Sequence, residues 1–409
     1  MVEHGFFLCL HSLNQIYDYL FDSLTQLMAP KLKWSPSELR PYRKITDPIA
    51  DRVVADIIEN DKTEGINKLF SQLRENDDIS EINFPKCVAD YFEETSELPS
   101  FMDQEQVKIG QKVFAQFGPE ISLCLMTKSL PEAYACANGA KVLYATGRLT
   151  EQSGTLAVFT RRLMETAQFV INVSDEGGLS PKGKGVVTAQ KVRLIHAAIR
   201  YYLQQHNWPE KYYGMPINQE DMAGTLQSFS TLTLEGLDIL KLDLSEEEKQ
   251  GYYHSWRCIG HVMGVLPELN PVTYQEGYGL GTSILNHQIA PSKEGTELTQ
   301  AVCNFMKDMM PGGIFDQAPE AIIRHMVGDD IAETLKLDSK LNLIEKMIPK
   351  LIGIIFDKLE EVGEEHETLE KIIERVKGYL LQHMLNHFNN DKKVKFYIPP
   401  SLRKNWKLE

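Results

Sequence analysis

One histidine in the sequence stands in a setting that suits metal binding. His196 lies in the stretch from Val186 to His206, VVTAQKVRLIHAAIRYYLQQH, whose apolar spacing predicts an α-helix. Its neighbours on one apolar face are Val192, Ile195, Ile199 and Leu203, and the residues on another face are Arg193, Arg200 and Gln204. Two interpretations are open. The ring is a core histidine with a satisfied hydrogen bond, or it is a metal ligand, since an apolar surround keeps imidazole neutral.

A second predicted helix, from Thr155 to Val173, carries two hydrogen-bond donors on its buried face. Helical periodicity places Arg162 and Thr166, at i and i+4, on that face, and Arg161 and Glu165 on the polar one. An always-charged guanidinium is rarely buried without a partner. Arg162 therefore either forms a structural salt bridge with a carboxylate elsewhere or, together with Thr166, faces a ligand.

The segments around these helices indicate what that ligand would be. The glycine-rich stretch 174–185, SDEGGLSPKGKG, predicts a loop that joins the two helices. The segment 131–149 is rich in small residues, which let a neighbouring helix or a flat cofactor approach closely. An inward neutral histidine, an apolar slot and donors on the other side are what a haem pocket needs. The pair His383 and His387 has zinc-type spacing but no third ligand nearby, and we interpret it as solvated.

Composition excludes several classes of function. The 409 residues carry a formal net charge of −14, which argues against general nucleic-acid binding. No apolar run reaches the ~20 residues that span a bilayer, and we see no export signal at the start. The six cysteines form no C-x-x-C pair, which fits a reducing compartment. We therefore expect a cytoplasmic protein, whose basic tail 391–409 docks on its own chain or forms a homodimer contact.

Almost every periodic segment repeats at 3.6 residues, which predicts an all-α fold. The expected local signals include caps at Asp47, Asp103, Asn218 and Ser245, a helix end at Gly118-Pro119, and a cap at Thr188 for the His196 helix. We expect three parts that form one compact unit. They are an N-terminal helical extension (1–120), a core (121–310), and C-terminal helices with the basic tail (311–409).

Three runs resemble a known family of oxygenases. They are RRLMET (161–166), RLIHAAIR (193–200) and PINQEDMAGTLQSFS (216–230). They look like the latex-clearing rubber oxygenases and their fungal relative, which cleaves a prenyl side chain in mycophenolate biosynthesis. The similarity covers roughly residues 130–285. It implies a globin-like helical core that binds haem b non-covalently, with His196 as the proximal ligand and Arg162 and Thr166 on the distal side.

The resemblance also implies an activity, with O₂ as co-substrate and cleavage of C=C bonds into carbonyls. Rubber-cleaving members resemble Arg-x-x-Lys-Thr where this chain has Glu165, which argues for an apolar isoprenoid-like or other unsaturated small molecule rather than polyisoprene. Glu165 is the nearest candidate for a general base, although periodicity points it outward. Arg200 would pair a haem propionate or form a surface salt bridge. The alternatives are a non-catalytic globin-like haem protein that senses gas or redox state, and a helical protein in which His196 is structural.

Overall fold

The computed structural model describes residues 34–75, 83–150, 156–309 and 318–337. Within these ranges the chain is built of helices, and its β-type pairing is an isolated antiparallel bridge between Cys136 and Ile289. The all-α fold predicted from the sequence is confirmed. In chain order the elements are α2 (Pro36–Leu39), the 3₁₀-helix η1 (Arg40–Lys44), α3 (Pro48–Glu75), α4 (Lys86–Glu94), α5 (Gln104–Cys124), the π-helix η2 (Leu125–Ser129), α6 (Leu130–Ala135), α7 (Ala137–Thr150), α8 (Leu156–Ser174), α9 (Lys184–Gln205), α10 (Glu210–Tyr213), α11 (Gln219–Phe229), α12 (Thr231–Ile239), α13 (Glu246–Val262), the 3₁₀-helix η3 (Pro267–Leu269), α14 (Tyr274–Gln288), α15 (Lys293–Met309), α16 (Ala318–Val327) and α17 (Asp329–Thr334).

The main apolar core anchors α8 against α11 and α13. Trp256 of α13 is 1% exposed and stacks on Phe229 of α11, with ring centroids 5.0 Å apart. Phe169 of α8 meets both rings, with centroids 5.9 Å from Trp256 and 6.0 Å from Phe229. Aromatic contacts of this kind each add about 0.5–1.5 kcal/mol beyond burial. These contacts hold α8, the helix that carries Arg162, firmly against the core.

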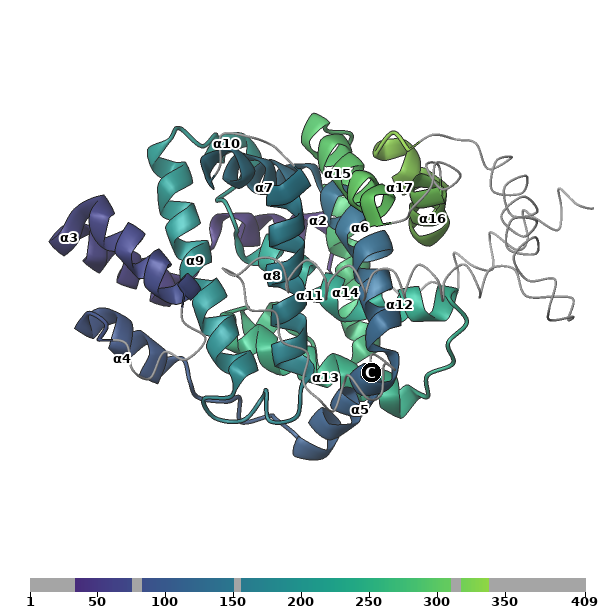
Figure 1. Cartoon of the computed structure of the whole chain (residues 1–409), viewed down its shortest axis with the longest axis horizontal. Helices are drawn as coiled ribbons and strands as arrows, with labels where there is room; N and C mark the ends of the chain where they lie inside the picture. The colour runs from purple at the N-terminus through teal and green to yellow at the C-terminus, as the bar shows by residue number, and fades with distance from the viewer. Residues whose placement is uncertain (1–33, 76–82, 151–155, 310–317, 338–409) are drawn as a thin grey trace, which may run out of the picture.

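Helix α9 lies between α8 and the pair α3 and α4, which form one edge of the molecule (Figure 1). Leu194 and Ala198 pack into the cluster shared with α3 and α4. Each is two residues from His196 and so points to the opposite side of the helix. Ala189 shares the face of His196, because it lies seven residues earlier, and it packs in the main core with Val173 of α8. The His196 face of α9 is thus directed toward α8.

Local sequence signals located four helix starts. Asp103, Asn218 and Ser245 cap α5, α11 and α13 through hydrogen bonds to backbone N–H groups, as predicted. Asp47 also accepts from a backbone N–H in the first turn of α3, with Oδ1 3.4 Å from the Ala50 nitrogen. These caps act within one turn of chain, which is why the sequence alone reveals them.

Two local predictions differ from the structure. The backbone leaves the helical conformation at Phe117 (φ −116°, ψ 16°), directly before Gly118-Pro119, but the helix does not end there and resumes to Cys124 within α5. The cap of α9 is Gly183 rather than Thr188, whose hydroxyl donates to the Lys184 carbonyl inside the helix. Within the segment 131–149, Cys136 separates α6 from α7 through its bridge to Ile289.

Some predictions stay untested. The C-terminal helices expected beyond residue 337, the pair His383 and His387, and the basic tail lie outside the described residues. The division into three parts, the homodimer and the cytoplasmic location stay predictions. None of the helices in the described ranges combines the length and low charge that a bilayer-spanning helix needs.

Candidate functional site

His196 occupies the middle of α9 as a neutral ring that the surrounding protein atoms cover only in part. Burial, assisted by the positive charge of Arg200, lowers the pKa of His196 to about 4, while Asp47 opposes the shift. The ring therefore lies deep in the protein, and yet protein atoms leave part of its surface uncovered. Its Nδ1 atom is buried without a hydrogen-bond partner among the described residues. The hydrogen bond expected of a structural core histidine is thus missing at this atom.

Two buried ion pairs bracket His196 and fasten α9 to α3. Arg193 donates from Nε to Asp47 Oδ2 at 2.5 Å, from Nη2 to Asp47 Oδ1 at 2.8 Å and from Nη1 to the Val262 carbonyl at 2.9 Å. One turn farther along α3, Asp51 Oδ1 lies 2.7 Å from Nε of Arg200. Arg200 is 1% exposed, and the surface salt bridge considered for it is instead a buried one, made with a partly exposed aspartate. Its assignment to a cofactor propionate stays a prediction, and the chain supplies its own carboxylate.

This arrangement differs from the expected pattern of burial on α9. The two arginines are buried, whereas four members of the predicted apolar face are only partly covered, namely Val192, Ile195, His196 and Ile199. Asp47 and Asp51 explain the burial of the arginines, because a paired guanidinium tolerates a dry environment. No local pattern around either arginine indicates these partners, which lie 146 and 149 residues away along the chain.

On α8, Arg162 and Thr166 are half-buried, and Glu165 is exposed. Arg162 donates from Nη1 to the Leu143 carbonyl of α7 at 3.3 Å, and the Thr166 hydroxyl donates to the Arg162 carbonyl at 2.9 Å. Glu165 points outward as predicted and pairs with Nε of Arg161 at 3.3 Å. The adjacent arginines therefore serve different sides of the helix.

The short connection between α8 and α9 sets Arg162 and His196 at the same height. Arg162 lies twelve residues before Ser174, where α8 ends, and His196 lies twelve residues after Lys184, where α9 begins. At 1.5 Å per residue, both are ~18 Å from the connecting loop. The register is fixed near the loop by Asn172, which donates to the Thr188 hydroxyl at 3.0 Å. The loop closes tightly because Gly183 has no side chain, since a Cβ there would lie 2.3 Å from the Gly177 carbonyl oxygen.

The run NQED (218–221) is a scaffold for the Asp47 and Arg193 contact, which sequence reasoning missed. Gln219 donates from Nε2 to the carbonyls of Thr46 at 3.0 Å and Gly264 at 2.9 Å, and it accepts from the Leu266 N–H at 3.0 Å. It thereby ties the residue before Asp47 to a loop that contacts the Arg193 guanidinium. The next two residues, Glu220 and Asp221, have basic side chains as partners.

Glu220 is fully buried, and its Oε1 lies 2.6 Å from His287 Nδ1. Asp221 accepts from Arg43 at 2.8 Å, and burial raises the pKa of the Asp221 carboxyl although Arg43 opposes this.

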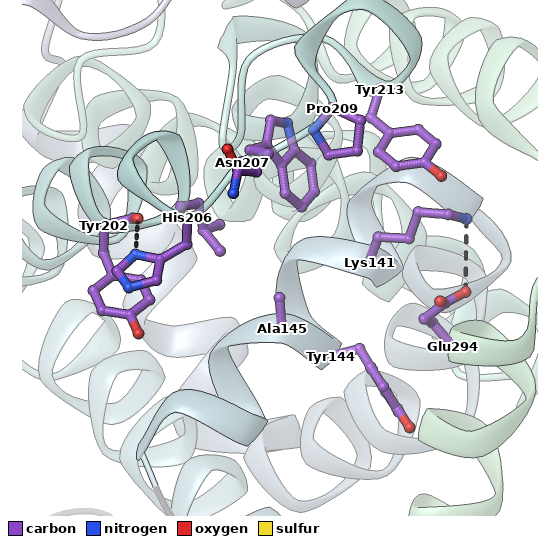
Figure 2. Close-up of a pocket in the computed structure, with 11 residues that line it drawn as sticks. Lys141, Tyr144, Ala145, Tyr202, His206, Asn207, Pro209, Tyr213 and Glu294 are labelled. Carbon is purple, nitrogen blue, oxygen red and sulfur yellow. Dashed lines mark hydrogen bonds and ion pairs between the residues drawn. The ribbon is translucent and has the colours of Figure 1, made fainter.

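A surface pocket of about 380 Å³ opens beside this assembly (Figure 2). It lies where α7, the end of α9, the following loop with α10, and the start of α15 meet. Its lining includes Lys141, Tyr144, Ala145, Tyr202, Leu203, His206, Asn207, Trp208, Pro209, Tyr213 and Glu294. His196 is not among the residues that line this pocket.

Comparison with known proteins assigns the family. Residues 123–343 match the model described as ER-bound oxygenase mpaB/B'/Rubber oxygenase, catalytic domain, a match of more than half the chain. The chain belongs to this family. The predicted resemblance is thereby confirmed, and the class of enzyme that the family indicates is an oxygenase.

Individual relatives agree with the family assignment. A rubber oxygenase of Streptomyces sp. (strain K30) is 24% identical over 339 residues, which is 79% of each of the two chains. A structure of latex clearing protein LCP in the closed state matches with a TM-score of 0.68, covering 86% of this chain and 95% of that one at 20% identity. At that identity the structural match supports the fold alone.

Proposed function

We propose that the protein is a haem b-dependent oxygenase that uses O₂ to cleave a C=C bond of an apolar, unsaturated small molecule. The observation that carries the proposal is the state of His196, which is neutral, unpartnered at Nδ1 and level with Arg162 on the neighbouring helix. Cleavage balances without another reductant, because one alkene and one O₂ give two carbonyls.

The residues present fit haem better than a bare metal ion. No group of three or more His, Cys, Asp or Glu side chains in the described ranges could hold a metal ion. Haem needs only one protein ligand here, because the porphyrin supplies the other nitrogens, and a neutral imidazole is suited to that role. His196 would be that ligand, and when bound the haem would supply the iron that activates O₂.

The remaining residues would orient the His196 ring and polarise the bound O₂. Arg162 would donate a hydrogen bond on the distal side, and Thr166, one turn along α8, would support it. Arg193 and Arg200 would act through His196, because their ion pairs with α3 fix the position of the helix on which the ring is carried. Glu165 could act as a general base only if its side chain left Arg161 and turned inward. We therefore assign it no role in the proposed cleavage.

Adjacent arginines provide a matched test of the distal assignment. Haem-loaded protein would be assayed for O₂ uptake and for carbonyl products with squalene and farnesol as unsaturated isoprenoid probes. We expect Arg162→Met to lower the rate about 10²–10³-fold, the usual effect of removing one donor that stabilises developing negative charge. Arg161→Met should change it less than about threefold. Equal effects of the two substitutions, with unchanged haem absorption, would contradict the assignment.

A further inference from the structure

The pocket shown in Figure 2 has two aromatic walls with a small residue between them. On one side, the rings of Tyr202 and His206 stack with centroids 3.8 Å apart and an interplanar angle of 12°. On the other, Trp208 and Tyr213 meet edge to face at 5.7 Å. Ala145 of α7 lies between the walls. At about 380 Å³ the pocket is within the size range of small-molecule sites, and aromatic walls suit an unsaturated chain.

The pocket and the His196 side chain lie on the same face of α9. Leu203 lines the pocket and is seven residues from His196, so the two share a face and are about 10 Å apart along the helix. Ile199 stands between them and is only partly covered. On α7, Tyr144 of the pocket directly follows Leu143, whose carbonyl accepts from Arg162. Helix α9, which carries His196, therefore also lines the pocket, and α7 links the pocket to Arg162.

The ion pair of Lys141 and Glu294 at the rim of the pocket indicates which chemical group a ligand would place there. Lys141 Nζ lies 3.6 Å from Glu294 Oε2 and 5.2 Å from the Tyr213 ring centroid, and it donates to the Ala137 carbonyl. The side chains of Lys141 and Glu294 are 22% and 25% exposed. A free carboxylate or phosphate would be repelled by Glu294, and an ammonium would be repelled by Lys141. A hydroxyl matches both, because it accepts from the lysine and donates to the glutamate.

We propose that this pocket binds the hydroxyl end of an elongated unsaturated alcohol, whose chain runs along α9 from Leu203 past Ile199 toward His196. This inference rests on the proposed oxygenase function, because it takes the ligand of the pocket to be the substrate of the oxygenase. It adds to that function the class of molecule, a neutral unsaturated alcohol, and the residues that hold its polar end, Lys141 and Glu294. Ala145 leaves the room that the chain occupies.

The test measures binding to the purified full chain, with all-trans-retinol as a fluorescent unsaturated isoprenoid alcohol and farnesol as its competitor. We expect Ala145→Phe to weaken retinol binding at least tenfold, because the new ring fills the pocket. Gln116→Phe, at an exposed position on α5, should leave the dissociation constant unchanged. Undiminished retinol binding in Ala145→Phe would overturn the proposal.

The rim pair is tested separately with an alcohol and its ether. Lys141→Met and Glu294→Gln should each weaken retinol binding about three- to tenfold. Retinyl methyl ether lacks the hydroxyl donor, so Glu294→Gln should weaken its binding much less. Lys293→Met removes an exposed neighbouring lysine that pairs with Glu297 and should change neither ligand. Loss of alcohol and ether binding to the same degree in Glu294→Gln would overturn the hydroxyl assignment.

Binding and oxidation fail independently. If retinol binds in the pocket and the Lys141 and Ala145 variants respond as expected, but no alkene is oxidised by haem-loaded protein, the pocket assignment holds and the oxygenase proposal fails. If alkenes are oxidised and Ala145→Phe changes neither their binding nor their turnover, the oxygenase proposal holds and the pocket assignment fails.

Discussion

Substitution of Asp47 by alanine should cost much of the stability of the chain. Asp47 and Arg193 are 2% and 6% exposed, and the carboxylate accepts two of the three hydrogen bonds made by the guanidinium. In Asp47→Ala the charged guanidinium would stay buried with the Val262 carbonyl as its remaining recorded acceptor. Breaking a buried pair in this way typically costs about 3–5 kcal/mol.

Helix α3 carries its own control for this prediction. Arg52 pairs with Glu94 at 3.1 Å, but their side chains are 61% and 47% exposed, so Arg52→Ala should cost less than about 1 kcal/mol. Urea unfolding, followed by circular dichroism, would give the midpoint of each variant and of wild type. The midpoints would be compared with the same dependence of the unfolding free energy on urea concentration. In addition, the double variant Asp47→Leu with Arg193→Met should recover part of the loss, because no charge is then left unpaired. A loss of under about 1 kcal/mol in Asp47→Ala would refute the argument that this contact fixes α9.

Two further predictions concern other buried charges and a backbone position. Lys128 of the π-helix lies 2.7 Å from Glu132, both being almost fully buried, and burial raises the pKa of Glu132 to about 7. Lys128→Met should raise that pKa further. Because the folded carboxyl then binds its proton more tightly than the unfolded one, stability should fall as pH rises from 5 to 9, by up to about 1.4 kcal/mol per pH unit. Urea midpoints across that range would test it, and a flat difference from wild type would contradict it. Gly264 has φ +79°, and a Cβ there would lie 2.6 Å from the Arg193 guanidinium, so Gly264→Ala should lower the melting temperature by several degrees. An unchanged melting temperature would show that the loop adapts freely.

The features that the sequence predicted correctly depend on neighbours within a turn or two. The caps of α5, α11 and α13 follow from Asp103, Asn218 and Ser245, each beside the N–H groups that it binds. The opposite orientations of Arg161 and Arg162 follow from helical periodicity, and the structure pairs Arg161 with Glu165 and Arg162 with the Leu143 carbonyl.

The features that the sequence did not predict depend on contacts between distant segments. The burial of Arg193 and Arg200 requires carboxylates from α3, and nothing in the run RLIHAAIR identifies them. The break at Cys136 depends on a bridge to Ile289, far along the chain. Periodicity also treats an apolar face as filled core, whereas His196 and Ile199 on that face are only partly covered, and this difference becomes visible only in the folded chain.

The central claim is that His196 is the iron ligand of a bound haem, and an absorption spectrum tests it most directly. Wild-type protein, His196→Ala and His206→Ala would be loaded with haem and compared. His206 is the matched control, because it lies just after α9 and stacks on Tyr202 at the surface. We expect a Soret band in wild type and in His206→Ala that is lost or shifted in His196→Ala. No Soret band in the loaded wild type, or the same band in His196→Ala, would contradict it.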